Sequence, residues 1–370
     1  MNKIKSTLEK YAEILVDYSV KVQKGDLVLI RAQSPICQPL VKEIYKLVLK
    51  RGANPVVRCT MDGLSEDFIK YANDEQLEYI DPMTRIEYEK VDKLISIGAP
   101  ENVKNMARAD AKKMAKRSKA TRELSSAMLK RSAEGKMNWV IADYPTQALA
   151  QEAKMSLDDY TDFIINSCYL DIESPIDKWR EIAREQERIV NLLNGGKKLH
   201  IIGEKTDITF SVEGRKWISC AGEMNFPDGE IFTSPVEDSA NGEIYFDFPA
   251  IYRGNESHKI YLKLENGKVI EARAEKGEEF LLSMLDMDEG SRFVGEIAIG
   301  TNDRIVDVTG NILFDEKIGG SIHMAVGASY PETGGKNESG LHWDIIKNMK
   351  SNSKIFLDDK LIYENGKFVI

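Results

Sequence analysis

The sequence lacks cysteine pairs, long apolar runs and a surplus of positive charge, and each absence excludes a class of protein. Its four cysteines include no Cys-x-x-Cys pair, which argues against a zinc ribbon, and a disulfide framework is not expected in a chain of 370 residues. We expect each cysteine to be a buried apolar side chain. No apolar run approaches the roughly 20 residues of a membrane-spanning helix, and a net charge of −9 disfavours nucleic acid as a partner.

Nucleotide-binding and secretion signals are missing as well. No Gly-x-Gly-x-x-Gly segment follows a predicted strand and no Gly-x-x-x-x-Gly-Lys-Ser/Thr segment occurs, so dinucleotide and P-loop sites lack their backbone signatures. Residues 1–15 mix charges into a helical apolar pattern, whereas a signal peptide requires an unbroken apolar segment. We therefore predict a cytoplasmic protein.

The first half of the chain alternates predicted helices with short apolar runs. Residues 5–22 carry apolar side chains at helical spacing, and a second helix is predicted from about residue 39 to 51. Predicted strands lie at residues 27–30, 54–59, 93–97 and 138–142. Because such alternation builds a parallel sheet, we predict an α/β N-terminal domain, residues 1–196, with a mostly parallel open sheet.

A segment dense in Lys and Arg, residues 104–131, separates the last two of these strands. It is either a patch for phosphate or an acidic partner, or a solvated helical face with Met106, Met114 and Met128 turned inward. The second interpretation is favoured, because charge runs alone identify little.

The second half has the composition of a β-rich domain. Two Glu-Asn-Gly-Lys segments, at 265–268 and 364–367, predict hairpin turns because Asn and Gly both accept a positive φ. A helix is predicted over residues 278–285. Predicted strands rich in β-branched and aromatic residues lie at 199–203, 207–212, 242–247 and 258–264. We predict a C-terminal β-rich α+β domain over residues 197–370.

Two of the four histidines, His323 and His342, lie among carboxylates in a glycine-rich region. A mixed set of imidazole and carboxylate ligands suits zinc, manganese, cobalt or iron better than calcium or magnesium. His342 and Asp344 are two residues apart, so on a strand they face the same side. His323 and Glu316 flank a Gly-Gly turn that is flexible enough to bring both side chains together.

Two further carboxylates are candidates for the same site. Glu296 lies alone in the apolar run 294–300, where an acid is costly unless it is paired or coordinates a cation. Glu230 lies at the start of a short predicted strand, directly after a turn. The other histidines, His200 and His258, are expected to be surface or strand-pairing residues rather than ligands.

Five segments resemble, in their order along the chain and in their local sequence, the M29 metallopeptidase family of aminopeptidase T and aminopeptidase S. The segments are 225–238, 295–296, 313–316, 322–330 and 337–344. The resemblance extends over nearly the whole chain and is strongest from residue 225 to 344. It implies the two predicted domains, with the C-terminal one as the metal-binding catalytic domain. It also implies a homodimer that encloses an internal cavity, and a site for two divalent metal ions: zinc, cobalt or manganese.

When the family's motifs are matched to this sequence position by position, the resemblance implies six metal-binding residues and an active-site tyrosine, Tyr330. The six are Glu230, Glu296, Glu316, His323, His342 and Asp344. Glu316 and His323 are more widely spaced here than is typical of the family, so Glu316 is the first member to examine in a structure.

The implied activity is that of an aminopeptidase acting on peptides with a free N-terminus. Two cations about 3.5–4 Å apart lower the pKa of a shared water, and a general base takes its proton. One of Glu230, Glu296 and Glu316 can be that base rather than a ligand, and Glu230 is our candidate. The Tyr330 hydroxyl can donate a hydrogen bond to the oxyanion of the tetrahedral intermediate.

Two alternatives remain open at the level of the sequence. His323, His342 and Asp344 also match the ligand set of a mononuclear non-haem iron dioxygenase of the dihydroxypyridine type. Glu230 and Glu296 argue against it, because a single iron would not need them. The other alternative is a catalytically inactive binding homologue, against which the complete candidate ligand set argues.

Overall fold

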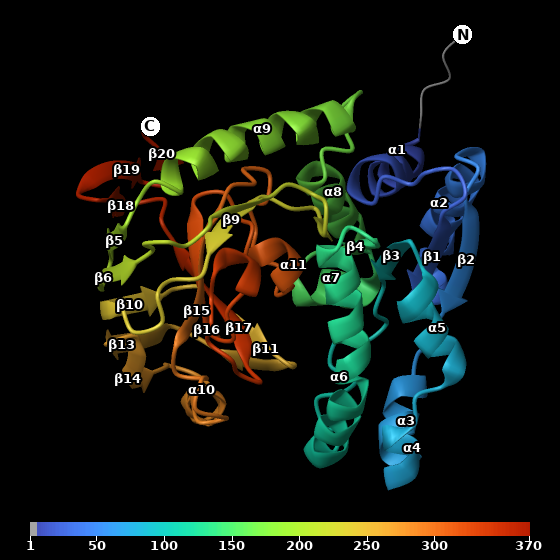
Figure 1. Ribbon diagram of the computed structural model, residues 1–370, viewed down its shortest axis with the longest axis horizontal. Helices are drawn as coiled ribbons and strands as arrows, with labels where there is room; N and C mark the ends of the chain where they lie inside the picture. The colour runs from blue at the N-terminus through green and yellow to red at the C-terminus, as the bar shows by residue number, and fades with distance from the viewer. Residues whose placement is uncertain (1–5) are drawn as a thin grey trace. The chain divides into compact units, whose positions relative to one another are not determined.

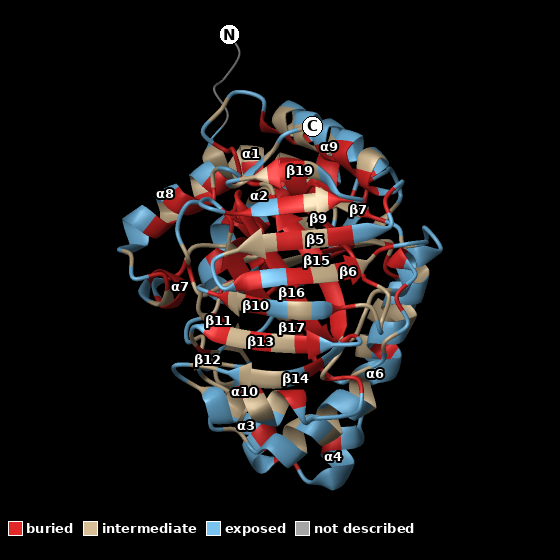
Figure 2. Cartoon of the chain, turned by 90° about the vertical axis from the view of Figure 1, so that its left-hand side faces the viewer, coloured by how far each residue is buried: buried red, intermediate tan, exposed pale blue. Residues whose placement is uncertain are grey.

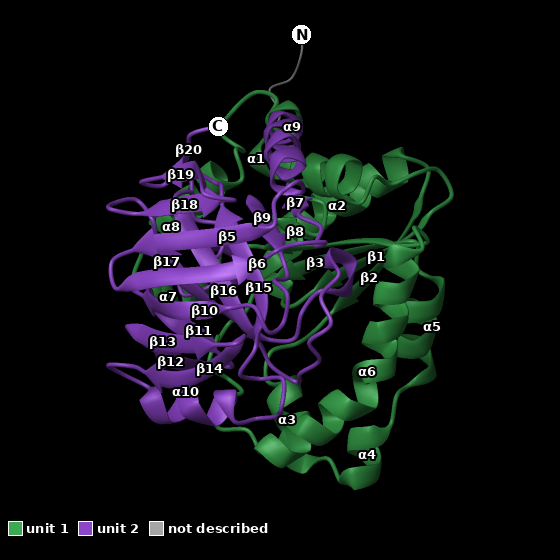
Figure 3. Ribbon diagram, turned by 60° about the vertical axis from the view of Figure 1, so that its left-hand side comes forward, with its two compact units in different colours: residues 1–178, 222–227 green, residues 179–221, 228–370 purple. Residues whose placement is uncertain are grey.

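The computed structural model describes residues 6–370, which form two compact units (Figure 3). Unit 1 comprises residues 1–178 and 222–227, and unit 2 comprises residues 179–221 and 228–370. The chain passes from one unit to the other inside helix α9 (Pro175–Leu193). The domain boundary predicted after residue 196 lies just beyond the end of this helix and stays a prediction.

Unit 1 is built on a five-stranded parallel sheet with the strand order β2-β1-β3-β4-β8. Figure 1 labels β1 to β4, and Figure 3 labels β8. The four predicted strands are confirmed, and the fifth comes from the segment that returns from unit 2. The strands are β1 (Leu27–Ala32), β2 (Asn54–Cys59), β3 (Lys93–Gly98), β4 (Asn138–Asp143) and β8 (Asn225–Phe226).

The N-terminal helix is irregular. Residue 5, the first of the helix predicted over residues 5–22, lies outside the described chain. The helix α1 (Thr7–Glu13) begins after its capping residue Ser6 and continues into a π-helical turn, η1 (Ile14–Ser19). The helix predicted from residue 39 is α2 (Gln38–Lys50). The other helices of this unit are α3 (Leu64–Tyr71), α4 (Asp74–Glu78), α5 (Pro82–Lys90), α6 (Ala111–Ala133), α7 (Gln147–Glu152) and α8 (Leu157–Ser167).

Helix α6 contains most of the basic segment. Lys116 forms an ion pair with Asp74 at 3.2 Å, and Met106 and Met114 pack against the buried apolar residues of α3 and α4. The methionines therefore face inward while charged side chains pair with neighbouring helices or face solvent, as the favoured interpretation predicts.

Unit 2 contains two antiparallel sheets and a short ribbon of β11 (Ala250–Tyr252) and β12 (Asn255–Ser257). The larger sheet has the order β14-β13-β10-β6-β5-β18-β19-β20, and the smaller one the order β17-β16-β15-β9-β7. The larger sheet consists of β5 (Lys198–Gly203), β6 (Thr206–Ser211), β10 (Asn241–Phe246), β13 (Ile260–Glu265), β14 (Lys268–Arg273), β18 (Lys354–Leu357), β19 (Lys360–Glu364) and β20 (Lys367–Phe368). The smaller sheet consists of β7 (Ile218–Cys220), β9 (Glu230–Thr233), β15 (Val294–Gly300), β16 (Ser321–Gly327) and β17 (His342–Asn348).

Local turn chemistry sets the register of two hairpins. Asn266 and Gly267 have φ values of 49° and 79°, and Asn365 and Gly366 have 49° and 84°. Both Asn-Gly pairs therefore form the tight turns that were predicted. The predicted helix α10 (Glu278–Leu285) is also confirmed, and a short helix, α11 (Ile312–Asp315), precedes β16.

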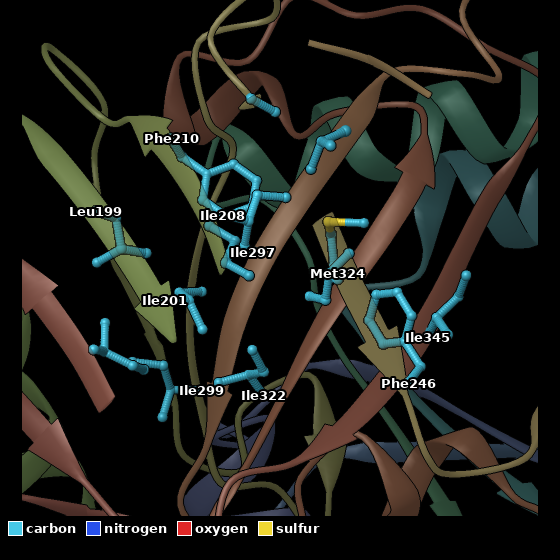
Figure 4. Packing of buried hydrophobic residues seen from close by; sticks show 14 of the residues in the cluster. Leu199, Ile201, Ile208, Phe210, Phe246, Ile297, Ile299, Ile322, Met324 and Ile345 are labelled. Atoms are coloured by element: carbon cyan, nitrogen blue, oxygen red, sulfur yellow. The ribbon is translucent and has the colours of Figure 1, made fainter. Parts of the chain in front are cut away.

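The core of unit 2 lies between its two sheets (Figure 4). Ile201 of β5 and Ile208 of β6 project from the larger sheet, and Ile299 and Met324 project from the smaller one. Residues of β6 and β13 in the larger sheet alternate between buried and more exposed positions (Figure 2), as expected for a sheet with one face toward a core and the other toward solvent.

The prediction that every cysteine is buried is only partly confirmed. Cys37 and Cys168 are buried as expected and Cys220 is half-buried, but Cys59 is exposed because β2 is an edge strand with few covering residues. Within residues 6–370, no helix is long and apolar enough to cross a membrane.

We predict that Ile299→Ala lowers the free energy of unfolding by about 2–5 kcal/mol, because it removes buried methyl groups and leaves a cavity between the sheets. The matched control is Ile270→Ala, since Ile270 lies on a strand of the same unit but is 48% exposed. Urea unfolding of both variants measures the difference. Equal losses in the two variants would contradict the placement of the core.

Candidate metal centre

The smaller sheet of unit 2 has one apolar face and one polar face. Along β15, Ile297 and Ile299 point into the core, so Glu296 between Gly295 and Ile297 points to the opposite side. The same alternation places the candidate residues of β16 and β17 on that polar face. The residues involved are Glu230 of β9, Glu296 of β15, His323 of β16, and His342 and Asp344 of β17.

Small residues stand beside these long side chains on the neighbouring strands. On one neighbouring strand the partners are Gly300 for Glu230, Ala298 for His323, Gly327 for His342, and Ala325 for both Glu296 and Asp344; on the other, Cys220 pairs with Glu230 and Ile346 with His323. Since directly paired residues share a face of a sheet, glycine and alanine leave room for the imidazoles and carboxylates to converge. This pattern is present in the sequence but was not used to predict the site.

The two imidazoles face the carboxylates through the same ring nitrogen. His323 Nε2 lies 3.3 Å from Glu230 Oε2 and 3.6 Å from Glu296 Oε1. His342 Nε2 lies 3.2 Å from Glu296 Oε2 and 3.5 Å from Asp344 Oδ1. Glu296 therefore lies between the two histidines and joins them into one cluster.

Backbone carbonyls hold the other nitrogen of each ring. His323 Nδ1 lies 3.0 Å from the carbonyl oxygen of Glu316, and His342 Nδ1 lies 2.8 Å from that of Ala328. A carbonyl can only accept, so Nδ1 carries a proton and donates it. In a neutral ring this leaves the lone pair on Nε2, which is the arrangement found in metal-binding histidines.

Glu316 joins the cluster although it lies on a different type of element. It follows α11, and its side chain is mostly buried. Ligand atoms of Glu230, Glu316 and His323 lie within 4.8 Å of one another, as do those of Glu296, His323 and Asp344. The structure thus brings all six candidate ligands together, and the wider spacing of Glu316 and His323 does not separate them.

Lys317 also lies in the cluster and was not anticipated. Its side chain is fully buried, its ammonium contacts Glu316 Oε1, and its Nζ lies 3.6 Å from Glu230 Oε1. In the sequence it follows Asp315-Glu316, which is typical of a solvated charged turn, so no local signal distinguishes it.

Burial and charge shift the pKa values of the cluster in opposite directions. Burial raises the pKa of Glu230 to about 8, although Lys317 and His323 lower it. Burial by itself would lower the pKa of the imidazoles, but the carboxylates raise it to about 10 for His323 and about 12 for His342. The raised pKa values of the imidazoles show that the carboxylates create a negative potential at this face, which would also attract metal cations.

Two carboxylate oxygens of the cluster lack hydrogen bonds. Glu230 Oε2 and Asp344 Oδ1 are buried and have no hydrogen-bond partner, although an imidazole nitrogen lies within 3.5 Å of each. Buried oxygens of this kind are costly unless a cation satisfies them. The donor set of imidazole nitrogens and carboxylate oxygens therefore fits a divalent transition metal.

Tyr330 lies at the edge of the cluster. Its hydroxyl oxygen is 3.4 Å from His342 Nε2, and its ring packs edge-on against Phe232 with centroids 5.1 Å apart. Its backbone N–H donates to Ser234 Oγ at 3.1 Å. Burial and the nearby carboxylates raise the pKa of Tyr330, so its hydroxyl stays protonated and can act as a donor.

The remaining histidines lie outside the cluster, as expected. His200 Nε2 is 2.7 Å from Asp207 Oδ1, and His258 Nε2 is 3.2 Å from Glu256 Oε2. A third group of potential ligands borders the cluster and was missed at the level of the sequence. It consists of Cys220 and Asp228 together with Glu230.

Comparisons with known proteins agree over nearly the full length of the chain. Residues 4–368 match the model of the family described as thermophilic metalloprotease (M29). Aminopeptidase 2 of Geobacillus stearothermophilus is 29% identical over 90% of this chain and 86% of its own. Aminopeptidase T of Thermus thermophilus is 27% identical over 99% of this chain and 97% of its own.

A solved structure shows the same fold. Wild-type AmpT from Thermus thermophilus superposes with a TM-score of 0.86, at 24% sequence identity, and covers 98% of this chain and 99% of its own. The predicted fold class is thereby confirmed. The relatives named above favour the peptidase over the iron dioxygenase, and the enzyme class predicted from the resemblance is confirmed. The chain belongs to the M29 family of metalloproteases, which use divalent metal ions.

Proposed function

We propose that this protein is an aminopeptidase that removes N-terminal residues from peptides, with two divalent cations at the polar face of the smaller sheet. The observation that carries the proposal is the convergence of five potential ligands, joined by His342 through its contacts with Glu296 and Asp344, around buried carboxylate oxygens that lack hydrogen bonds. The orientation of both imidazoles by backbone carbonyls supports it, because each directs Nε2 into the cluster. Zinc, cobalt and manganese all suit this donor set.

The metal-binding residues in this proposal are Glu230, Glu296, Glu316, His323, His342 and Asp344. When bound, the cations lower the pKa of a water molecule, polarise the carbonyl of the first peptide bond and hold the free α-amine. The remaining steps depend on side chains of the chain itself.

Glu230 is the residue to which we assign the general base. A base must be able to accept a proton, and burial favours the protonated form of Glu230 by raising its pKa to about 8 in the metal-free chain. Its two oxygens face different partners, with Oε1 toward Lys317 and Oε2 toward His323, so it can contact a cation and still exchange a proton. Tyr330 donates a hydrogen bond to the oxyanion that forms when water attacks the carbonyl.

Homodimer formation and a cytoplasmic location stay predictions from the sequence and its resemblance. Size-exclusion chromatography with light scattering measures the first directly. A monomer that has full activity would remove dimerisation from the proposal.

We predict that manganese, cobalt or zinc raises the melting temperature of the metal-stripped protein, because an ion that binds only the folded state stabilises it. Glu296→Gln should abolish most of this rise, since Glu296 contacts both imidazoles. Glu279→Gln, which changes an exposed glutamate on α10, is the matched control and should keep the full rise. Calorimetric scans with and without metal provide the measurement, and a wild-type protein that no metal stabilises would contradict the proposed centre.

We predict that the metal-loaded protein releases p-nitroaniline from leucine p-nitroanilide. Glu230→Gln should remove this activity but keep the metal bound near Glu296, because a lost base lowers kcat while most ligands remain. No turnover with any of the three metals, over a panel of N-terminal residues, would overturn the proposed activity. One iron per chain together with oxygen uptake would support the dioxygenase instead.

We also predict that Tyr330→Phe lowers kcat by about 10²–10³-fold without changing metal content, since it deletes one donor to the oxyanion. Tyr261→Phe is the control, because the Tyr261 hydroxyl donates to Glu243 on the exposed face of the larger sheet. Steady-state kinetics and metal analysis of both variants separate a catalytic role from a structural one. Unchanged kcat in Tyr330→Phe would exclude the assigned role.

A further inference from the structure

Lys317 is fixed in place by the backbone as well as by its side chain. Its N–H donates to the carbonyl of Phe314 at 3.0 Å, and its own carbonyl accepts from Asn302 N–H at 3.0 Å. The side chain has no exposed surface. The ammonium therefore cannot turn to solvent without displacing this segment.

An ammonium buried in this way needs compensating negative charge, because removing a charge from water costs several kcal/mol. The carboxylates of Glu230 and Glu316 supply it: Lys317 contacts Glu316 Oε1 directly and lies 3.6 Å from Glu230 Oε1. Asp228 adds a third negative charge nearby. Glu230 and Glu316 are also two of the carboxylates that the proposed metal centre would use.

The two halves of the centre consequently differ in the group that balances their carboxylates, an ammonium in one and imidazoles in the other. One half, which we call the Glu230–Glu316 half, consists of these two residues and His323, and it already contains an ammonium. The other, the Glu296–Asp344 half, consists of Glu296, His342 and Asp344. The short contacts of its carboxylates are with imidazole nitrogens.

We propose that the Lys317 ammonium acts as a built-in cation of the Glu230–Glu316 half. The centre then binds one divalent cation tightly in the Glu296–Asp344 half, and a second binds more weakly because it competes with Lys317 for the same carboxylates. This inference rests on the proposed metal centre and adds to it an order of filling. It also implies that loading with two cations moves the Lys317 ammonium away from at least one of its partners.

The experiment is a stepwise titration of the metal-stripped, full-length protein with Mn²⁺. Binding is measured during the titration by calorimetry and, independently, by equilibrium dialysis. In the wild type we expect one tight site per chain and a second site at least ten-fold weaker. Lys317→Met should tighten the second site at least ten-fold, because it keeps the length of the side chain and removes the competing charge. Lys317→Arg keeps the charge and should leave the second site weak.

Lys347→Met is the matched control. Lys347 is also buried, but its Nζ donates to the carbonyls of Glu204 and Tyr245, on the core side of β17. This variant should bind Mn²⁺ as the wild type does. It therefore separates a general effect of losing a buried lysine from the loss of competition between Lys317 and the second cation.

Two equally tight sites in the wild type would overturn the inference even if Lys317→Met fails to fold. A folded Lys317→Met with an unchanged weak site would overturn it as well. Neither result would affect the proposed activity, which requires only that both sites fill. Absence of any bound Mn²⁺, Co²⁺ or Zn²⁺ in the wild type would instead overturn the proposed centre, and this inference with it.

Discussion

The two-residue period of the smaller sheet in unit 2 is the constraint on which the rest of the structure depends. One face of its strands carries Ile297, Ile299 and Met324 into the core, and the other face carries the charged cluster. A shift of one residue in register would exchange the two faces and bury carboxylates among aliphatic side chains. The positions of the site residues are therefore set by the same strand pairing that directs the apolar residues into the core.

The charged face is costly by itself. Four carboxylates, two imidazoles and the Lys317 ammonium lie close together with little access to water, and removing such groups from solvent is unfavourable even when they are paired. The packed apolar layer behind them offsets this cost. Because most of the ligands lie on strands rather than loops, their geometry is also held more firmly than loop residues would allow.

Much of this arrangement could be predicted from short-range patterns. The strands of both units have clear apolar or alternating signals, His342 and Asp344 share a face by spacing, and Glu296 stands out as a lone acid in an apolar run. Glu230 and Glu316 have weaker local signals, a preceding turn for Glu230 and a following Gly-Gly turn for Glu316, and the resemblance to a known family was needed to identify both as ligands. Their own segments carry no periodicity that points to a common site.

Other features depend on contacts that local sequence does not encode. Lys317 has the neighbours of a surface residue, and only the approach of Glu230 from a distant strand accounts for its burial. The exposed Cys59 reflects the edge position of β2, which strand order determines. Strand β8 has two residues, too few for any periodic signal.

That short strand bears on how the protein folds as it is synthesised. Strand β8 pairs with β4 in parallel and belongs to unit 1, although it is separated from the rest of that unit by residues 179–221. Until residue 227 has left the ribosome, β4 is an open edge of the sheet, and open edges favour pairing with other chains. A nascent chain that pauses before this point therefore exposes a site for aggregation that the finished protein covers.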